Sequence, residues 1–232
     1  MEAENLNYRP VVLAVAVATA GVLPAFLTGG LAVQVRGELD FDAGAFGLAV
    51  AAFFATSSLA STVMGRLVER IGSHRGMRLA EVGSATSLLG VSLFAGSWEG
   101  LVTCLVLGGL ANAVAHPATH LSLAREVPAG RQGFSFGIKQ AAIPTATLLA
   151  GLAVPGIAIT FGWRWAFAGG AALALAVALF VPAGTARAPG AIALAALATV
   201  LVGRRMVLHD RAVIPATGAA IPPYPFTNSH EN

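Results

Sequence analysis

Two histidines stand four residues apart in the apolar segment His116-Pro-Ala-Thr-His120, and Asn112 precedes the first of them by another four residues. In an α-helix, residues at this spacing lie on one face. Imidazole and amide groups donate and accept hydrogen bonds, and an imidazole can also exchange protons. The pattern therefore predicts a helix face that holds a polar ligand.

A second polar pair, Lys139 and Gln140, lies in the next apolar segment of the chain. An ammonium group attracts anions strongly where its surroundings screen charge poorly. We expect Lys139 to attract a substrate anion, and His116 and His120 to donate hydrogen bonds or exchange protons. Asn112 and Gln140 would orient the solute. The alternatives are interhelical hydrogen bonding by the histidines, and a lysine that reaches out to lipid headgroups.

The histidine spacing also occurs in zinc-binding helices, so a metalloenzyme has to be weighed. Pro117 occupies the position of the metalloprotease glutamate, and no third ligand accompanies the two histidines. An intramembrane metalloenzyme is therefore the weaker hypothesis. We expect no enzymatic activity, no metal and no cofactor.

The segments that carry these residues are too apolar for a soluble domain. Apolar residues make up 56% of the chain and charged residues 11%, against about 45–50% and 25% in soluble proteins. The apolar residues form blocks of about 18 to 25 residues, and a helix of that length spans a hydrocarbon core about 30 Å thick. The six blocks cover residues 11–33, 43–64, 79–96, 101–123, 134–160 and 165–181. The sequence predicts an all-α, polytopic membrane bundle of about six transmembrane helices.

The last part of the chain has a different composition, because six of the twelve prolines fall between Pro182 and Pro225. Its apolar stretch, 188–202, would measure only about 22 Å as a helix, and three arginines follow it. We therefore assign residues 1–182 to a six-helix transmembrane domain. Residues 183–232 are expected to form an Ala-, Pro- and Arg-rich tail that does not span the membrane and is partly disordered.

Positive residues alternate between the connections, and they stay preferentially on the cytoplasmic side of a membrane. The connections after the second and fourth predicted helices hold Arg66, Arg70, Arg75, Arg78, Arg125 and Arg131. The N-terminus is therefore expected in the cytoplasm, in a bacterial inner membrane. The net charge of +3 comes from these loops, and no basic stripe indicates nucleic-acid binding.

The connection after the second predicted helix carries the strongest motif, Gly65-Arg66-Leu67-Val68-Glu69-Arg70-Ile71-Gly72-Ser73-His74-Arg75. It resembles the loop signature of the major facilitator superfamily, Gly-x-Leu-x-Asp-Arg-x-Gly followed by basic residues. The matching positions are Gly65, Leu67, Arg70, Gly72 and Arg75, and Glu69 stands where Asp is usual. Gly162-Trp163-Arg164-Trp165-Ala166-Phe167 is similar to the start of the sixth helix in that family, and 137–155 resembles the fifth helix of its cyanate- and nitroimidazole-permease-like members.

The resemblance covers about residues 9–182 and implies the N-terminal half of a secondary transporter, built from two three-helix repeats. Such a half moves a small polar or anionic solute by alternating access together with a second half. In the family, the acidic residue of the motif latches the two halves together, which is the role implied for Glu69. The chain is expected to be incomplete on its own and to need a second six-helix half or a second copy. The alternative is a non-transporting membrane fragment or an accessory subunit.

Three further expectations concern packing and pairing. Glu81, just inside the third predicted helix, should pair with a loop arginine rather than carry protons. Glu69 should pair with Arg70 or Arg75 or cap a helix. Gly133 and Gly137 should mark a site where two helices pack closely.

Overall fold

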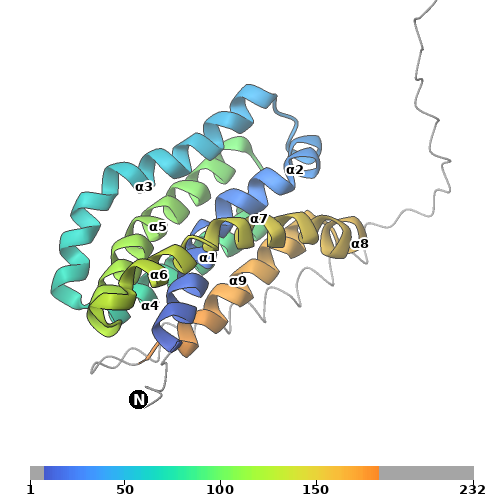
Figure 1. The fold of residues 1–232 in the computed structure, drawn as a ribbon. Coiled ribbons are helices and arrows are strands. Elements are labelled where there is room, and N and C mark those ends of the chain that lie inside the picture. Colours follow the sequence, from blue (N-terminus) through green and yellow to red (C-terminus); the bar gives the residue numbers. More distant parts are fainter. Residues whose placement is uncertain (1–7, 183–232) are drawn as a thin grey trace, which may run out of the picture.

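The computed structural model describes residues 8–182, and its regular elements there are all helical (Figure 1). The helices are α1 (Arg9–Gly30), α2 (Ala32–Leu39), α3 (Ala43–Ile71), α4 (Ser73–Phe94), α5 (Trp98–Glu126), α6 (Ala129–Lys139), α7 (Ala142–Ala153), α8 (Ile159–Phe161) and α9 (Trp163–Phe180), with a π-helical turn, Val154–Ala158, between α7 and α8. The predicted all-α fold is confirmed. The predicted tail, 183–232, lies outside the described residues.

Five helical stretches in the described part of the chain are long and apolar enough to cross a membrane: α1, α3, α5, the run Ala129–Phe161 from α6 to α8, and α9. The third predicted helix, α4, has 22 residues, as many as α1. Glu81 and several serines lower its apolar content, but these side chains are buried within the protein. Because α4 presents them to other helices rather than to lipid, it completes a six-helix membrane bundle.

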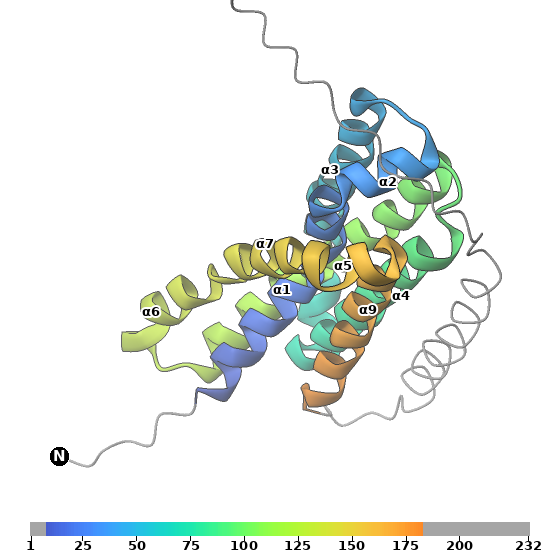
Figure 2. The same ribbon diagram turned by 90° about the vertical axis from the view of Figure 1, so that its right-hand side faces the viewer.

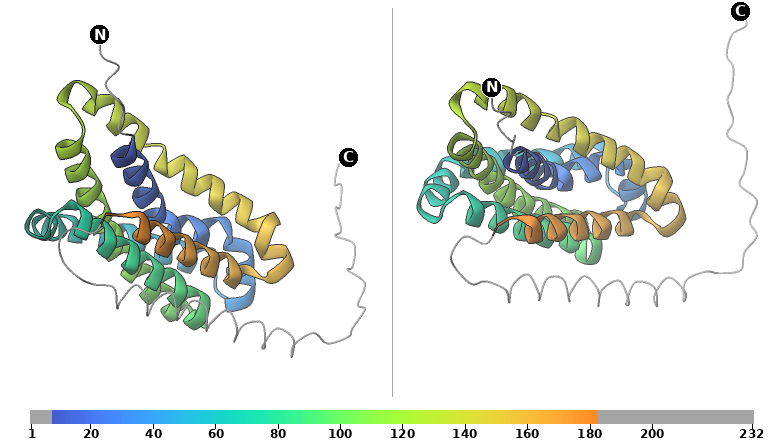
Figure 3. Two further views of the ribbon diagram at one scale, coloured as in Figure 1. Left: turned by 90° about the horizontal axis from the view of Figure 1, so that it is seen from below. Right: turned by 60° about the horizontal axis from the view of Figure 1, so that its bottom comes forward.

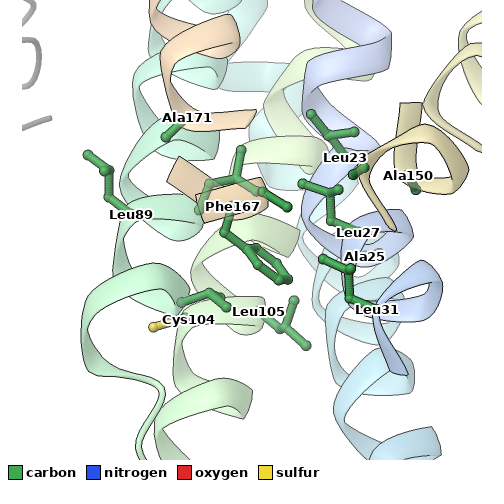
Figure 4. Packing of buried hydrophobic residues seen from close by; sticks show 14 of the residues in the cluster. Leu23, Ala25, Leu27, Leu31, Leu89, Cys104, Leu105, Ala150, Phe167 and Ala171 are labelled. Atoms are coloured by element: carbon green, nitrogen blue, oxygen red, sulfur yellow. The ribbon is translucent and has the colours of Figure 1, made fainter. Parts of the chain in front are cut away.

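Helix α1 runs through the middle of the bundle and packs against α5, α7 and α9, while α4 packs against α5 and α9, and α3 against α5 (Figure 2). The main apolar cluster lies where these helices meet. In Figure 4, Phe167 of α9 lies beside Leu27 of α1 and Leu31, the residue that follows α1. All three side chains are almost completely buried.

Small residues let the helices approach closely. A Cβ atom on Gly108 would lie 2.6 Å from Ser87 Oγ, and one on Gly109 would overlap the backbone carbonyl oxygen of Phe53. These contacts bring α5 against α4 and α3. The expectation for Gly133 and Gly137 is wrong, because nothing lies within 4 Å of a Cβ atom built at either position.

The motif residues predicted as a connection are mostly helical. Helix α3 continues to Ile71, and Gly72, with φ 89°, joins it directly to α4. Residues 66–71 contain no proline or glycine, so nothing in the sequence ends the helix before Gly72. Only glycine adopts such a φ without strain, which explains why the turn occurs at this residue.

The first and fifth predicted helices are both divided. Helix α1 ends at Gly30 and α2 follows after Leu31, whereas the helix passes Pro24 without ending. The fifth predicted helix breaks after Lys139. Pro144 has no N–H to donate to the carbonyl of Gln140 four residues earlier, so the helix loses a hydrogen bond at that point.

Glu38 of α2 binds the start of α9. Its carboxylate accepts hydrogen bonds from Trp163 Nε1 and from the guanidinium of Arg164, the latter at 2.8 Å. Arg164 also donates to the carbonyl oxygens of Ser92 and Ala95 at the end of α4. Trp163 is buried, so these residues connect three helices rather than only marking the headgroup level.

Two stretches contribute little of their surface to the core. In the most apolar 18-residue segment of each stretch, 17% of α3 and 28% of Ala129–Phe161 is buried inside the bundle. The corresponding share for α1 is 72%. Figure 3 shows the α6–α8 stretch along one outer side of the bundle, away from α4, with its last part against α9. These two stretches therefore have faces that the described helices do not cover.

Candidate functional site

His116 and His120 of the predicted polar face meet Lys139 where α6 folds back beside α5. Val127 and Pro128 form the connection, and Pro128 precedes the first residue of α6. The chain reverses there, so Lys139 at the end of α6 returns to the level of His120 and His116 on α5. The helix break after Lys139 leaves this side chain at a helix end.

Lys139 lies between the two histidines. Its Nζ atom is 2.8 Å from His120 Nε2 and 3.4 Å from His116 Nδ1. Only 2% of Lys139 is exposed, whereas both imidazoles lie at the surface of the described bundle. Lys139 therefore does not reach out to lipid headgroups in this structure.

The cluster of Lys139, His116 and His120 contains more hydrogen-bond donors than acceptors. A lysine ammonium has three N–H donors and no acceptor, and a neutral imidazole has one donor and one acceptor nitrogen. When Lys139 donates to one nitrogen of each ring, the remaining N–H of each ring points elsewhere. The cluster then offers imidazole N–H donors and a positive charge, which is a set of groups that suits an anion.

Within residues 8–182, no carboxylate pairs with Lys139. The described residues form two ion pairs, His74 with Glu126 and Arg164 with Glu38, and Lys139 belongs to neither. A buried ammonium without a counter-charge costs several kcal/mol. An anionic ligand at Lys139 would offset that cost.

Phe136 was missed by sequence reasoning. Its ring meets His120 edge to face, with 5.4 Å between ring centroids, and it lies one turn before Lys139 on α6. The i to i+3 spacing between Phe136 and Lys139 was the available signal. The aromatic ring restricts how His120 can turn and so helps to hold its Nε2 toward Lys139.

The other predicted ligand residues are not part of this cluster. Asn112 is 3% exposed and donates through Nδ2 to Ser57 Oγ at 2.8 Å, so it connects α5 to α3. Its Oδ1 atom has no hydrogen-bond partner among residues 8–182. Gln140 directly follows Lys139 and is exposed. Thr19 of α1 donates to the carbonyl of Ala142, just after the break in the fifth predicted helix.

A groove of about 430 Å³ lies between α1, α3 and α7. Its lining is apolar and small, with Phe26 and Phe54 as its aromatic residues and Thr147 as its polar side chain. The groove shares α1 and the α6–α8 stretch with the surroundings of Lys139. The same stretch therefore carries both the buried cation Lys139 and part of an apolar groove.

The sequence motif at the junction of α3 and α4 has most of its charged side chains at the surface. Glu69, Arg70 and Arg75 are exposed, and the ion pairs of residues 8–182 do not include Glu69. The expected pairing of Glu69 with a neighbouring arginine is therefore wrong. His74 instead binds Glu126 Oε1 at 3.3 Å and connects the start of α4 to the end of α5.

The histidine pair does not form a metal site in this structure. Within residues 8–182, no group of three histidine, cysteine, aspartate or glutamate side chains is arranged to hold a metal ion. An ammonium group also occupies the space between His116 and His120 and would repel a metal cation there.

A family model described as Major Facilitator Superfamily matches residues 11–223. No curated protein matches the chain.

Proposed function

The chain belongs to the major facilitator superfamily, a family of membrane transporters, and on this basis we propose that its helices form the N-terminal half of a secondary transporter for a small anionic solute. It is an integral membrane protein in contact with lipid. The observation that carries the proposal is the buried ammonium of Lys139, which has two histidine neighbours and, among the described residues, no carboxylate partner.

Each predicted residue has a role in this proposal. Lys139 attracts the anion, and His116 and His120 donate hydrogen bonds to it. Asn112 and Gln140, which lie outside the Lys139 cluster, would orient the solute. The Oδ1 of Asn112, which has no partner among the described residues, would supply an acceptor for a protonated or polar group. The small apolar groove beside α1 favours a compact solute.

Alternating access requires a second set of helices on the other side of the substrate. In transporters of this kind, the substrate lies between two repeats that rock around a fixed site. The uncovered faces of α3 and of the α6–α8 stretch suit such a partner, which we propose is a second six-helix half. Glu69, exposed at the end of α3, would contact that half in one state of the cycle.

Binding and transport can be tested separately with the purified 232-residue chain. In binding assays, a panel of small monovalent anions should contain members that bind saturably and compete with one another, while cations and neutral solutes should not compete. If no anion binds, or if only cations bind, the proposed substrate class is wrong. In proteoliposomes, the chain by itself should give no sustained uptake. Saturable uptake would contradict the need for a second half while leaving the anion site intact.

The orientation of the helices is a further prediction. Trp98 Nε1 donates to the carbonyl of Ala45, and His74 pairs with Glu126, so the Glu99 connection and the Arg131 connection lie at opposite ends of the bundle. The arginine distribution places the Arg131 end in the cytoplasm. In intact cells, an impermeant thiol reagent should label Glu99→Cys and should label Arg131→Cys only after permeabilisation. The opposite pattern would reverse the assigned topology.

A further inference from the structure

Glu81 is a buried acid that the proposed anion site does not use. It lies on α4, which packs between α5 and α9, and none of its surface is exposed. Within the part of the chain that the structure describes, neither carboxyl oxygen has a hydrogen-bond partner. Ser84, one turn further along the same helix, is also fully buried, and its hydroxyl has no partner among the described residues either.

The cations near α4 in the described structure are engaged elsewhere or make no bond to Glu81. The titratable side chains on the helices that pack against α4 are Arg9 on α1, Arg66, Glu69 and Arg70 on α3, Glu99, Cys104, His116, His120, Arg125 and Glu126 on α5, and Arg164 on α9. Arg164 pairs with Glu38, and the two histidines of α5 contact Lys139. On α4 itself, His74 pairs with Glu126, and the expected pairing of Glu81 with a loop arginine is wrong.

Arg78 is the cation that could have paired with Glu81. It precedes Glu81 by three residues, a spacing at which helical side chains are neighbours. Its guanidinium instead donates two hydrogen bonds, of 2.6 and 3.1 Å, to the carbonyl oxygen of Val181 at the end of α9. Arg78 therefore holds the end of α9 against α4 and leaves Glu81 without a counter-charge.

A carboxylate in these surroundings would lose its hydration and gain no hydrogen bond or cation in return, which is strongly unfavourable. We propose that Glu81 is a proton-binding site of the transport cycle and is a neutral carboxylic acid in the conformation described here. This rests on the proposed transport function. When the end of α9 separates from α4, Arg78 is released from Val181 and pairs with the ionised Glu81. Proton release and movement of α9 are thereby coupled.

Infrared spectroscopy of the purified chain tests the protonation state without any transport assay. A protonated carboxyl group absorbs at a frequency that an ionised carboxylate does not. At neutral pH, the wild-type protein should show this band and Glu81→Gln should lack it. The exposed acid Glu99 provides the matched control, and Glu99→Gln should retain the band. Arg78→Gln should retain it too, because the proton rather than the guanidinium neutralises Glu81.

Two results would overturn the proposal. The first is a wild-type spectrum at neutral pH with no band that depends on Glu81. The second is a band that disappears when sodium is added at constant pH, since a metal cation would then occupy the site. If Glu81→Gln is poorly folded, Glu81→Asp replaces it, and the band should shift in frequency rather than vanish. The band is independent of anion binding, so loss of binding in a Lys139 variant with the band intact would separate the two proposals.

Discussion

Lys139→Gln should weaken binding of the anionic solute by about 10- to 100-fold, because a hydrogen bond to a charged group contributes about 1.5–3 kcal/mol. The replacement keeps a polar side chain of similar length and removes the positive charge. His116 and His120 then lose the ammonium that lies between them. Equilibrium binding of the anion to the purified protein measures the effect directly.

The matched control for Lys139 is Arg131→Gln on the same helix, α6. Arg131 is exposed and has the same charge, but it lies in the first turn of the helix. Its replacement should leave anion affinity within about twofold, since screened surface charges contribute little. If both variants bind the anion as the wild type does, Lys139 has a structural role and the proposed site is wrong.

Gly109→Ala should destabilise the bundle by about 3 kcal/mol or more. The added methyl group would overlap the carbonyl oxygen of Phe53, and this oxygen is part of the backbone of α3 and cannot rotate away. Relief requires α3 and α5 to separate, which also loosens the packing of Phe53, a fully buried side chain. Reversible unfolding in detergent micelles, or the thermal melting midpoint where unfolding is irreversible, reports the loss.

Gly133→Ala is the control for this packing effect. It lies within helix α6 with nothing within 4 Å of the added atom. Alanine has the higher helix propensity, so this variant should be as stable as the wild type or more stable by up to about 1 kcal/mol. Equal destabilisation by the two substitutions would show that the close contact between α3 and α5 does not limit stability.

The chain's composition and apolar periodicity were sufficient to predict the membrane bundle. Hydrocarbon thickness sets helix length, and an unpaired backbone is too costly in lipid, so long apolar blocks allow one regular structure. Helix boundaries were predicted less well. The stretch 65–71 was assigned to a connection because of its charges, but charged residues at a membrane surface are compatible with helix, and α3 continues to Ile71.

The candidate site was predicted in part. The i to i+4 spacing placed His116 and His120 on one face of α5, because side-chain direction repeats with the helical turn. The spacing could not show that Lys139, 19 residues after His120, would lie between the two rings. It also could not show that Asn112 faces Ser57 on another helix and lies apart from the lysine.

The sequence by itself determined the protein's environment, its family and the helix face that carries its polar residues, because these depend on local periodicity and on a motif of contiguous residues. Only the tertiary structure decided how the charged groups pair. Lys139 lies between two histidines, Arg78 binds the carbonyl of Val181, and Glu81 remains without a partner in residues 8–182. Pairing depends on the rotation and height of one helix relative to another. Close contacts such as that between Gly109 and Phe53 set this geometry, and neither residue indicates it from its own position in the chain.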